Sequence, residues 1–315
     1  VPTMEGLARH GWVFENCISV AMLTNPSHVS LLTSLYPKDH GVYDNETGLA
    51  DGVPTIATIL KQAGYATSSV IGFPHLNPEV ANLGQGFSKV IPATMQERRA
   101  DETSRLALQV LDESPTEKPF FLWVHYVDPH APYDPPKSAP LPSLALKTPM
   151  RQAVAAAPSF QRHHPWFQNA FKTYRFVEEL EARYLAEVEE TDRGLKILVD
   201  GLLSKGYGSN TIVALTSDHG ESFGEHDLYF QHGGLYRPSL HVPLIVAMPD
   251  TEPKRLATLV SSIDVVPTLL GLLGLPEEPR MRGSSLSRFF SQDQLPSPVV
   301  FSEHMYHQQV AVRSL

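Results

Sequence analysis

The chain has 315 residues, of which 42% are hydrophobic and 19% are charged, which is enough for a sizeable core. Its formal net charge of −9 argues against a nucleic-acid partner, and a lone cysteine, Cys17, excludes an internal disulfide and a cysteine-based metal cluster. No apolar run reaches the roughly 18 residues that a membrane span needs. The 14 histidines direct the search toward metal ligands.

Predicted helices and strands alternate along the chain. Apolar residues at helical spacing, bounded by Pro or Gly, predict helices over 2–10, 27–35, 54–62, 101–111, 174–203 and 264–273. Apolar and β-branched runs predict strands over 65–72, 120–127, 211–216 and 242–248, with edge strands at 299–301 and 309–312. This order predicts one α/β domain, 1–315, with a mainly parallel central sheet sandwiched by helices. Residues 134–170, rich in Pro, Ala and Ser, are expected to form an insertion or lid.

The stretch 23–45, LTNPSHVSLLTSLYPKDHGVYDN, organises the rest of the chain. Thr24 precedes Asn25 and Pro26, and Pro is favoured in the first turn of a helix. Thr24 is therefore expected just before a helix N-terminus, where free N–H groups and the helix dipole favour an alkoxide or a bound phosphate. The alternative is that Thr24 is only an N-cap.

Polar residues follow two of the predicted buried strands. Asp128 and His130 come after 120–127, and Asp218 and His219 come after 211–216. In open α/β sheets, ligands gather beyond the carboxyl ends of the strands, so these residues are expected to converge on one edge. His125 is placed inside the first of these strands, either as a hydrogen-bonded core residue or as a site residue.

The Asp218-His219-Gly220 sequence suits a divalent cation, because a carboxylate and an imidazole stand side by side at a strand end. Gly220 is expected to permit a tight turn, and zinc is favoured over calcium or magnesium. His232, next to two glycines, is a further candidate ligand. The alternative for the pair is a helix-capping Asp beside a surface His.

Three stretches together resemble the sulfatase-like branch of the alkaline phosphatase superfamily: TNPSHVSLLTSLYPKDHGV, HYVDPHAPY, and SDHGESFGEH with the later HGGLY and VPLIV. Sulfatases carry Cys or Ser, any residue, then Pro-Ser-Arg, and oxidise the Cys or Ser to formylglycine. Here Thr24 replaces the Cys or Ser and His28 replaces the Arg. A Thr cannot yield that aldehyde, because its β-carbon carries a methyl group. The Thr-x-Pro-x-His form resembles nucleotide pyrophosphatase/phosphodiesterases, in which Thr attacks directly between two zinc ions.

This resemblance implies a metal-dependent hydrolase of phosphate esters, either a phosphomonoesterase or a phosphodiesterase, with Thr24 as the nucleophile. Asp218 and His219 would hold one metal, and Asp128, His130 and His232 are candidates for a second. The remaining implied roles are catalysis by Asn45 and His130 and substrate contact by His28 and His125. With a single metal, His130 and His232 would instead contact the substrate.

The resemblance also implies one or two divalent metals, zinc first, and a small-molecule, glycan-linked or lipid-linked phosphate or sulfate ester as substrate. An extracytoplasmic location is expected on the same ground. The first strand of this superfamily normally precedes the helix at 2–10 and ends in a metal-binding Asp, so we expect that strand upstream of Val1. Two alternatives stay open: a true sulfatase, and a non-catalytic member that binds an anion or a partner with an incomplete metal site.

Overall fold

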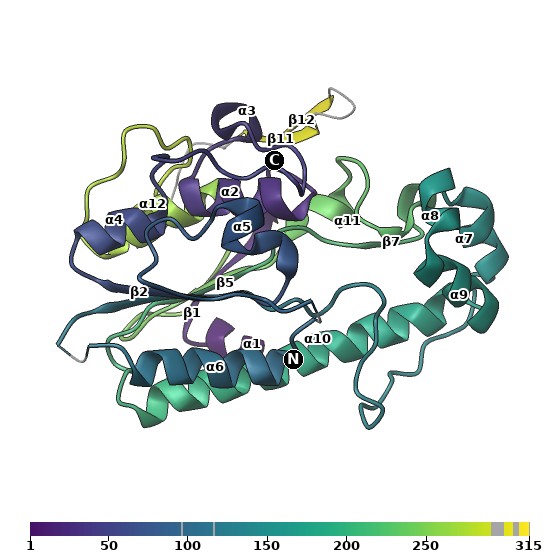
Figure 1. Cartoon of the computed structure of the whole chain (residues 1–315), viewed down its shortest axis with the longest axis horizontal. Coiled ribbons are helices and arrows are strands. Elements are labelled where there is room, and N and C mark those ends of the chain that lie inside the picture. The colour runs from purple at the N-terminus through teal and green to yellow at the C-terminus, as the bar shows by residue number, and fades with distance from the viewer. Residues whose placement is uncertain (96, 116, 291–298, 305–308, 315) are drawn as a thin grey trace.

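The computed structural model describes residues 1–315 except 96, 116, 291–298, 305–308 and 315. Helices cover both faces of a central layer of strands, which confirms the predicted α/β sandwich (Figure 1). The helices are α1 Pro2–Ala8, α2 Thr24–Thr33, α3 Pro37–His40, α4 Ile56–Gln62, α5 Pro78–Ala81, α6 Ala100–Asp112, α7 Met150–Ala156, α8 Ser159–His163, α9 Pro165–Thr173, α10 Val177–Ser204, α11 Arg237–Leu240 and α12 Val265–Leu272. None of the described helices is long and apolar enough to cross a membrane.

The strands of the central layer form two sheets with mixed strand directions. The strands are β1 Gly11–Ile18, β2 Ala66–Val70, β3 Lys89–Ile91, β4 Phe120–Val124, β5 Val213–Thr216, β6 Ser222–Phe223, β7 Tyr229–Gln231, β8 His241–Val242, β9 Leu244–Ala247, β10 Lys254–Ser261, β11 Val300–His304 and β12 Gln309–Arg313. In the central layer, one sheet has the order β10-β1-β9-β5, with β8 also paired to β1, and the other has the order β3-β2-β4; β6–β7 and β11–β12 are separate two-stranded sheets. Pairing is parallel in β1–β10 and throughout β3-β2-β4, and antiparallel around β8 and β9.

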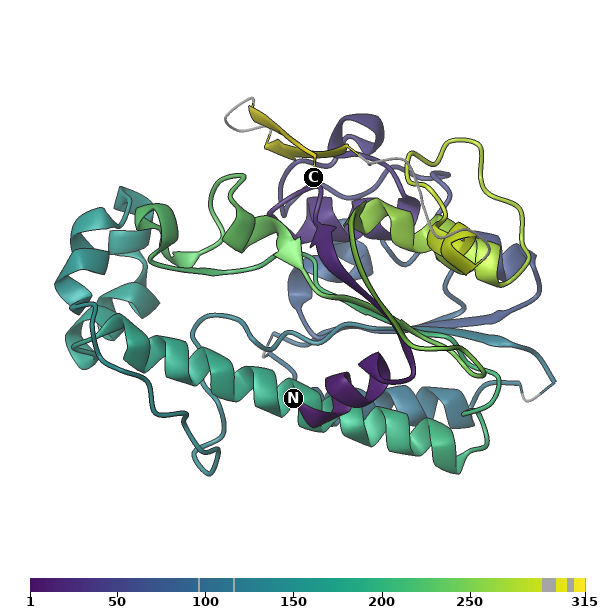
Figure 2. The ribbon, with the colours of Figure 1, turned by 180° about the vertical axis from the view of Figure 1, so that it is seen from behind.

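Helix α10 joins the two sheets, because its apolar side chains pack beneath both. Leu198 and Leu202 contact the cluster that includes β4, while Leu195 and Val199 contact the cluster that includes β5. Among the described residues, β4 and β5 each end their sheet, so each has one edge without a strand partner. Figure 2 shows the two sheets as one continuous layer above α10. This open edge explains why β4, although wholly apolar, is only half-buried.

Several predicted boundaries move for local reasons. α2 begins at Thr24 itself, so this residue belongs to the first turn. α4 begins at Ile56 because Thr55 and Thr58 form a capping box, which leaves Pro54 outside the helix. β4 ends at Val124, so the placement of His125 inside the strand was wrong.

The insertion is folded. Helices α7, α8 and α9 form a separate lobe at one end of the molecule, at the right of Figure 1. They share a hydrophobic cluster with α10 that includes Tyr133, Met150, Ala170 and Leu180. Their connection to the body of the protein therefore runs through a packed core.

Candidate functional site

Thr24 lies at the start of α2, and its side chain lines a cavity. Few backbone donors are free around it. The Asn25 N–H donates to Asn45 Oδ1 at 2.9 Å, Pro26 has no N–H, and the Ser27 N–H bonds within the first turn. The start of α2 therefore offers fewer N–H groups to an anion than the sequence predicted. The same contact holds the Asn45 side chain beside α2 through its oxygen, which leaves the Nδ2 group as a donor.

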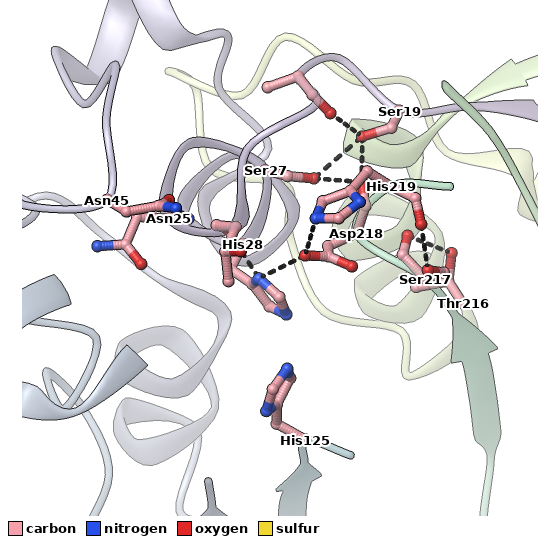
Figure 3. Close-up of polar contacts among 12 residues, drawn as sticks. Ser19, Asn25, Ser27, His28, Asn45, His125, Thr216, Ser217, Asp218 and His219 are labelled. Atoms are coloured by element: carbon pink, nitrogen blue, oxygen red, sulfur yellow. Dashed lines mark hydrogen bonds and ion pairs between the residues drawn. The ribbon is translucent and has the colours of Figure 1, made fainter. Parts of the chain in front are cut away.

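Asp218 is held through its backbone carbonyl. The buried hydroxyls of Ser19 and Ser27 donate to this oxygen at 2.5 and 2.6 Å (Figure 3). Ser19 follows β1 and Ser27 lies in the first turn of α2, so two elements nearly 200 residues away in sequence fix the residue that follows β5.

The Asp218 carboxylate faces two imidazoles. Its Oδ2 lies 3.3 Å from His219 Nε2 and 3.6 Å from His28 Nδ1. Burial alone raises the pKa of Asp218, but attraction to His219, His28 and His125 outweighs it and lowers the pKa below the ordinary range. The group is therefore a buried anion at neutral pH.

His28 and His125 are neutral neighbours that use Nδ1 differently: it donates in His28 and accepts in His125. His28 Nδ1 donates to the Thr24 carbonyl at 2.8 Å, and burial lowers the pKa of His28. His125 Nδ1 accepts from the Gly72 N–H at 3.3 Å, so its proton lies on Nε2. Burial and the adjacent His28 lower the pKa of His125 to about 3. The two rings meet edge to face with centroids 5.0 Å apart, and Figure 3 shows His125 pointing from the end of β4 toward His28.

His219 and His232 lie together, although they were predicted as ligands of different metals. Their ring centroids are 3.9 Å apart at an interplanar angle of 36°. His219 Nδ1 donates to the Gly220 carbonyl at 2.9 Å, and His219 Nε2 faces Asp218 Oδ2 at 3.3 Å. Burial lowers the pKa of His232 well below its usual value, and its buried Nδ1 has no hydrogen-bond partner among the described residues. The two imidazole rings therefore lie side by side, and His219 is also next to the Asp218 carboxylate.

The loop after β4 carries Asp128 and His130. Burial raises the pKa of Asp128 to about 6, opposed by Arg99 and the Ala100 N–H at the start of α6. The Asp128 carboxylate thus faces α6, and the structure does not bring it into the Asp218–His219 pair.

His130 stands closer to an acid than to the other histidines. Its Nδ1 is 3.6 Å from Glu97 Oε1, an ion-pair distance that is too long for a hydrogen bond. Burial alone lowers the pKa of His130, but Glu97 raises it above its usual value. Glu97 thus shifts His130 toward the imidazolium form where the loop lines the cavity.

All these segments open onto one cavity of about 120 Å³ at the ends of β4 and β5. It is lined by Thr24, Phe73, residues 125–130, Tyr184 and residues 217–221. A volume of that order holds several water molecules or one small tetrahedral oxyanion. Thr24, Asp128, His130, Asp218 and His219 thus share one cavity, whereas Asn45 and His232 are not among its lining residues. The roles assigned to these residues stay predictions.

The site is only part of a metal centre. His219 Nε2 and Asp218 Oδ2 lie 3.3 Å apart, close enough for both to be ligands of one cation. In the described part of the chain, however, no three His, Cys, Asp or Glu residues converge as a metal would require. Structural and catalytic zinc sites use at least three protein ligands, so a metal here needs a donor beyond this pair.

Two features of the site were missed in the sequence. Glu221 lines the cavity, burial raises its pKa, and Tyr133 donates to its Oε2 at 3.0 Å. The only feature of the sequence that could have pointed to Glu221 was its position directly after Asp218-His219-Gly220. Nothing in the sequence indicated Ser19, because its role depends on a hydrogen bond to the backbone carbonyl of Asp218.

The cavity at the strand ends and the layered fold define a class, the sulfatase-like branch of the alkaline phosphatase superfamily. The family model described as Sulfatase matches residues 1–275, and the chain belongs to that family.

Curated relatives are similar at low identity. The chain is 26% identical to an ulvan-active sulfatase of Formosa agariphila, over 91% of this chain and 59% of that protein. It is 25% identical to choline-sulfatase of Rhizobium meliloti, over 99% and 71%. It is 26% identical to human N-sulphoglucosamine sulphohydrolase, over 87% and 56%. The chain thus spans roughly 56–71% of the length of these relatives.

Solved structures share the fold. A phosphonate monoester hydrolase from Silicibacter pomeroyi superimposes with a TM-score of 0.76 at 23% identity, covering 96% of this chain and 74% of that one. A protein solved in complex with its substrate D-glucosamine-2-N,6-O-disulfate also gives 0.76, at 20% identity, covering 99% and 82%.

Proposed function

We propose that residues 1–315 carry the catalytic core of a phosphate-ester hydrolase in which Thr24 is the nucleophile. The observation that carries this is the place of Thr24: a hydroxyl that cannot be converted to the formylglycine aldehyde stands at the start of α2 and lines the same small cavity as Asp218 and His219. Sulfatases use an aldehyde hydrate at this position, which a Thr side chain cannot form. Direct attack by the hydroxyl is the chemistry left to this residue.

In the proposed reaction, Thr24 Oγ1 gives up its proton to water in the cavity and forms a bond to phosphorus while the bond to the leaving-group oxygen breaks. We assign stabilisation of the non-bridging oxygens to two neutral donors, the hydrogen on His125 Nε2 and the Nδ2 group of Asn45. His130, kept protonated by Glu97, donates a proton to the leaving oxygen. Water then cleaves the phosphothreonine and restores the hydroxyl.

The family generally uses a divalent metal, and Asp218 with His219 would supply two of its ligands. When bound, such a cation lowers the pKa of a coordinated hydroxyl and stabilises developing charge. Zinc is our first choice because the donor set contains imidazole, with calcium or magnesium as alternatives.

The missing donor has an obvious place in the sheet. Both β4 and β5 run toward the cavity, both pack on α10, and each has an open edge. We propose that a strand from outside residues 1–315 lies there and ends in an Asp beside Asp218. The gene sequence upstream of Val1 tests this, and an upstream region without an apolar run ending in Asp would favour the non-catalytic alternative.

Hydrolysis of sulfate esters is the second candidate, because the curated relatives named above are sulfatases. Substitution of Thr24 separates the two mechanisms. In the complete protein, Thr24→Ala should abolish phosphate-ester cleavage, whereas Thr24→Ser should retain part of it, because a primary hydroxyl still attacks. Full activity in Thr24→Ala would remove this residue from the mechanism.

A further inference from the structure

The insertion differs in charge from the rest of the molecule. Between Asp134 and Glu178 the sequence has six Lys and Arg residues, two His and no Asp or Glu. The remaining chain has 19 Lys and Arg against 34 acids, a net charge of −15. We define the cationic lobe as residues 135–177, whose basic residues are Lys137, Lys147, Arg151, Arg162, Lys172 and Arg175.

The charges of the cationic lobe are free. All six side chains belong to exposed residues, and none forms an ion pair within the described part of the chain. Basic residues elsewhere are often paired, as in Arg105–Asp101 at 2.6 Å. Accumulating unpaired like charges on one lobe is unfavourable unless something neutralises them, and such patches mark surfaces that bind the opposite charge.

The acidic residues that border the cationic lobe already have hydrogen-bond or ion-pair partners. Glu178 accepts from the Thr148 N–H at 3.0 Å, and Glu179 accepts from the N–H groups of Arg175 and Phe176 at 2.7 Å. Asp134 pairs with Arg183 at 2.9 Å. These contacts fasten the lobe to α10 and leave its own basic side chains uncompensated.

The cations stand on a rigid framework. The lobe is closed at its base by the Met150 N–H, which donates to the Arg175 carbonyl at 2.8 Å, and by a bridge between Pro149 and Phe176. Its helices pack on buried Tyr133 and Leu180. Binding would therefore require little ordering of the backbone, which removes one cost of association.

The lobe adjoins the cavity. Residues 125–130, which line the cavity, lead directly to Tyr133, whose hydroxyl bonds to Glu221 in the cavity wall. Tyr184 of α10 belongs both to the lobe's hydrophobic cluster and to the cavity lining. Because the cavity of about 120 Å³ encloses little more than one ester group, any larger substrate must extend over a neighbouring surface.

We propose that the cationic lobe is a docking surface for a polyanionic polysaccharide, one ester of which enters the cavity while other sulfate or phosphate groups lie on the lobe. The substrate class rests on the proposed function. The cations are spread singly over α7, α8 and α9 and the segments around them, an arrangement that an extended chain can follow. The exposed side chain of Phe160 makes an anionic membrane the competing partner.

Binding of dextran sulfate to the complete protein, measured without turnover, tests the proposal. The variant Arg162→Glu/Lys172→Glu should weaken binding at least about tenfold at low salt, and the loss should shrink as salt screens the charges. The control Lys61→Glu/Lys118→Glu changes the same total charge at exposed, unpaired positions outside the lobe and should stay within about twofold of wild type. Circular dichroism should show that both variants are folded.

Equal affinity of the two variants would overturn the proposal, as would wild-type binding to phosphatidylglycerol vesicles but not to dextran sulfate. Turnover of p-nitrophenyl phosphate, a substrate too small to reach the lobe, should be the same in both variants and wild type. If that turnover is present while the polymer binds both variants alike, the docking surface fails and the hydrolase stands. If turnover is absent but the polymer binds the lobe variant more weakly than the control variant, the docking surface stands and the proposed hydrolase activity fails.

Discussion

Gly220→Ala should disable the site by moving the strand-end loop that carries Asp218 and His219. Gly220 was expected to permit a tight turn, but it has no positive φ, and the structure gives a different reason for it. A Cβ at this position would lie 2.0 Å from the Pro238 carbonyl oxygen. Carbon–oxygen contacts stay beyond about 3 Å, so one backbone must move by about 1 Å.

Neither the backbone at Gly220 nor the backbone that follows Pro238 can move easily, because both are held by hydrogen bonds. The Gly220 N–H donates to the carbonyl of fully buried Ser239 at 2.7 Å, and the next carbonyl, of Leu240, accepts from the Ser19 N–H at 2.7 Å. We expect a cost of about 1–3 kcal/mol and a Tm lower by roughly 2–10 °C. A shift of His219 by about 1 Å should reduce kcat/KM about a hundredfold.

Thermal unfolding and turnover of p-nitrophenyl phosphate by the complete protein measure both effects. Gly6→Ala is the matched control, because nothing lies within 4 Å of a Cβ in that helical position. It should stabilise the protein by up to about 1 kcal/mol without changing kcat/KM. A Gly220→Ala protein with wild-type Tm and turnover would show that the contact with Pro238 carries no constraint.

Three further results are expected. Ser27→Ala removes one donor to the Asp218 carbonyl and should cost about 1 kcal/mol in chemical denaturation, with a larger fall in kcat/KM; an unchanged kcat/KM would deny the positioning role. Because Glu97 raises the pKa of His130, the acid form is lost as pH rises through that pKa, so Glu97→Gln should move the alkaline limb of the kcat/KM profile to lower pH, and an unmoved limb would exclude His130 as the acid. His232→Ala should lower both metal occupancy and kcat if this side chain is a ligand, but only kcat/KM if it contacts substrate, and elemental analysis distinguishes the two.

Elements and site residues could be predicted from the sequence where the local pattern and the position in the chain indicate the same structure. α10 was predictable because its apolar residues recur at helical spacing over seven turns. The cavity was predictable because Asp218 and Asp128 directly follow apolar runs, and strand ends meet at one edge. The location of the complete protein in the cell stays a prediction.

Other features depend on contacts that sequence does not display. β10 was missed because it pairs with β1, some 240 residues away, and only its last three residues are buried. The antiparallel pairing of β9 with β1 and β5 is likewise set by tertiary order. Three helices lay unpredicted in a Pro-rich insertion, since the cluster around Tyr133 stabilises them more than their own propensities do.

The central claim is that unmodified Thr24 cleaves phosphate esters in preference to sulfate esters. A phosphate monoester carries up to two negative charges against one on a sulfate ester, so a divalent cation held by Asp218 and His219 would favour the phosphate transition state. The direct measurement compares p-nitrophenyl phosphate and its diester analogues with p-nitrophenyl sulfate, in protein shown by mass spectrometry to be unmodified at Thr24. We expect phosphate cleavage to be at least about a hundredfold faster, equivalent to about 2.7 kcal/mol. Sulfate cleavage faster than that of every phosphate ester tried would contradict the account.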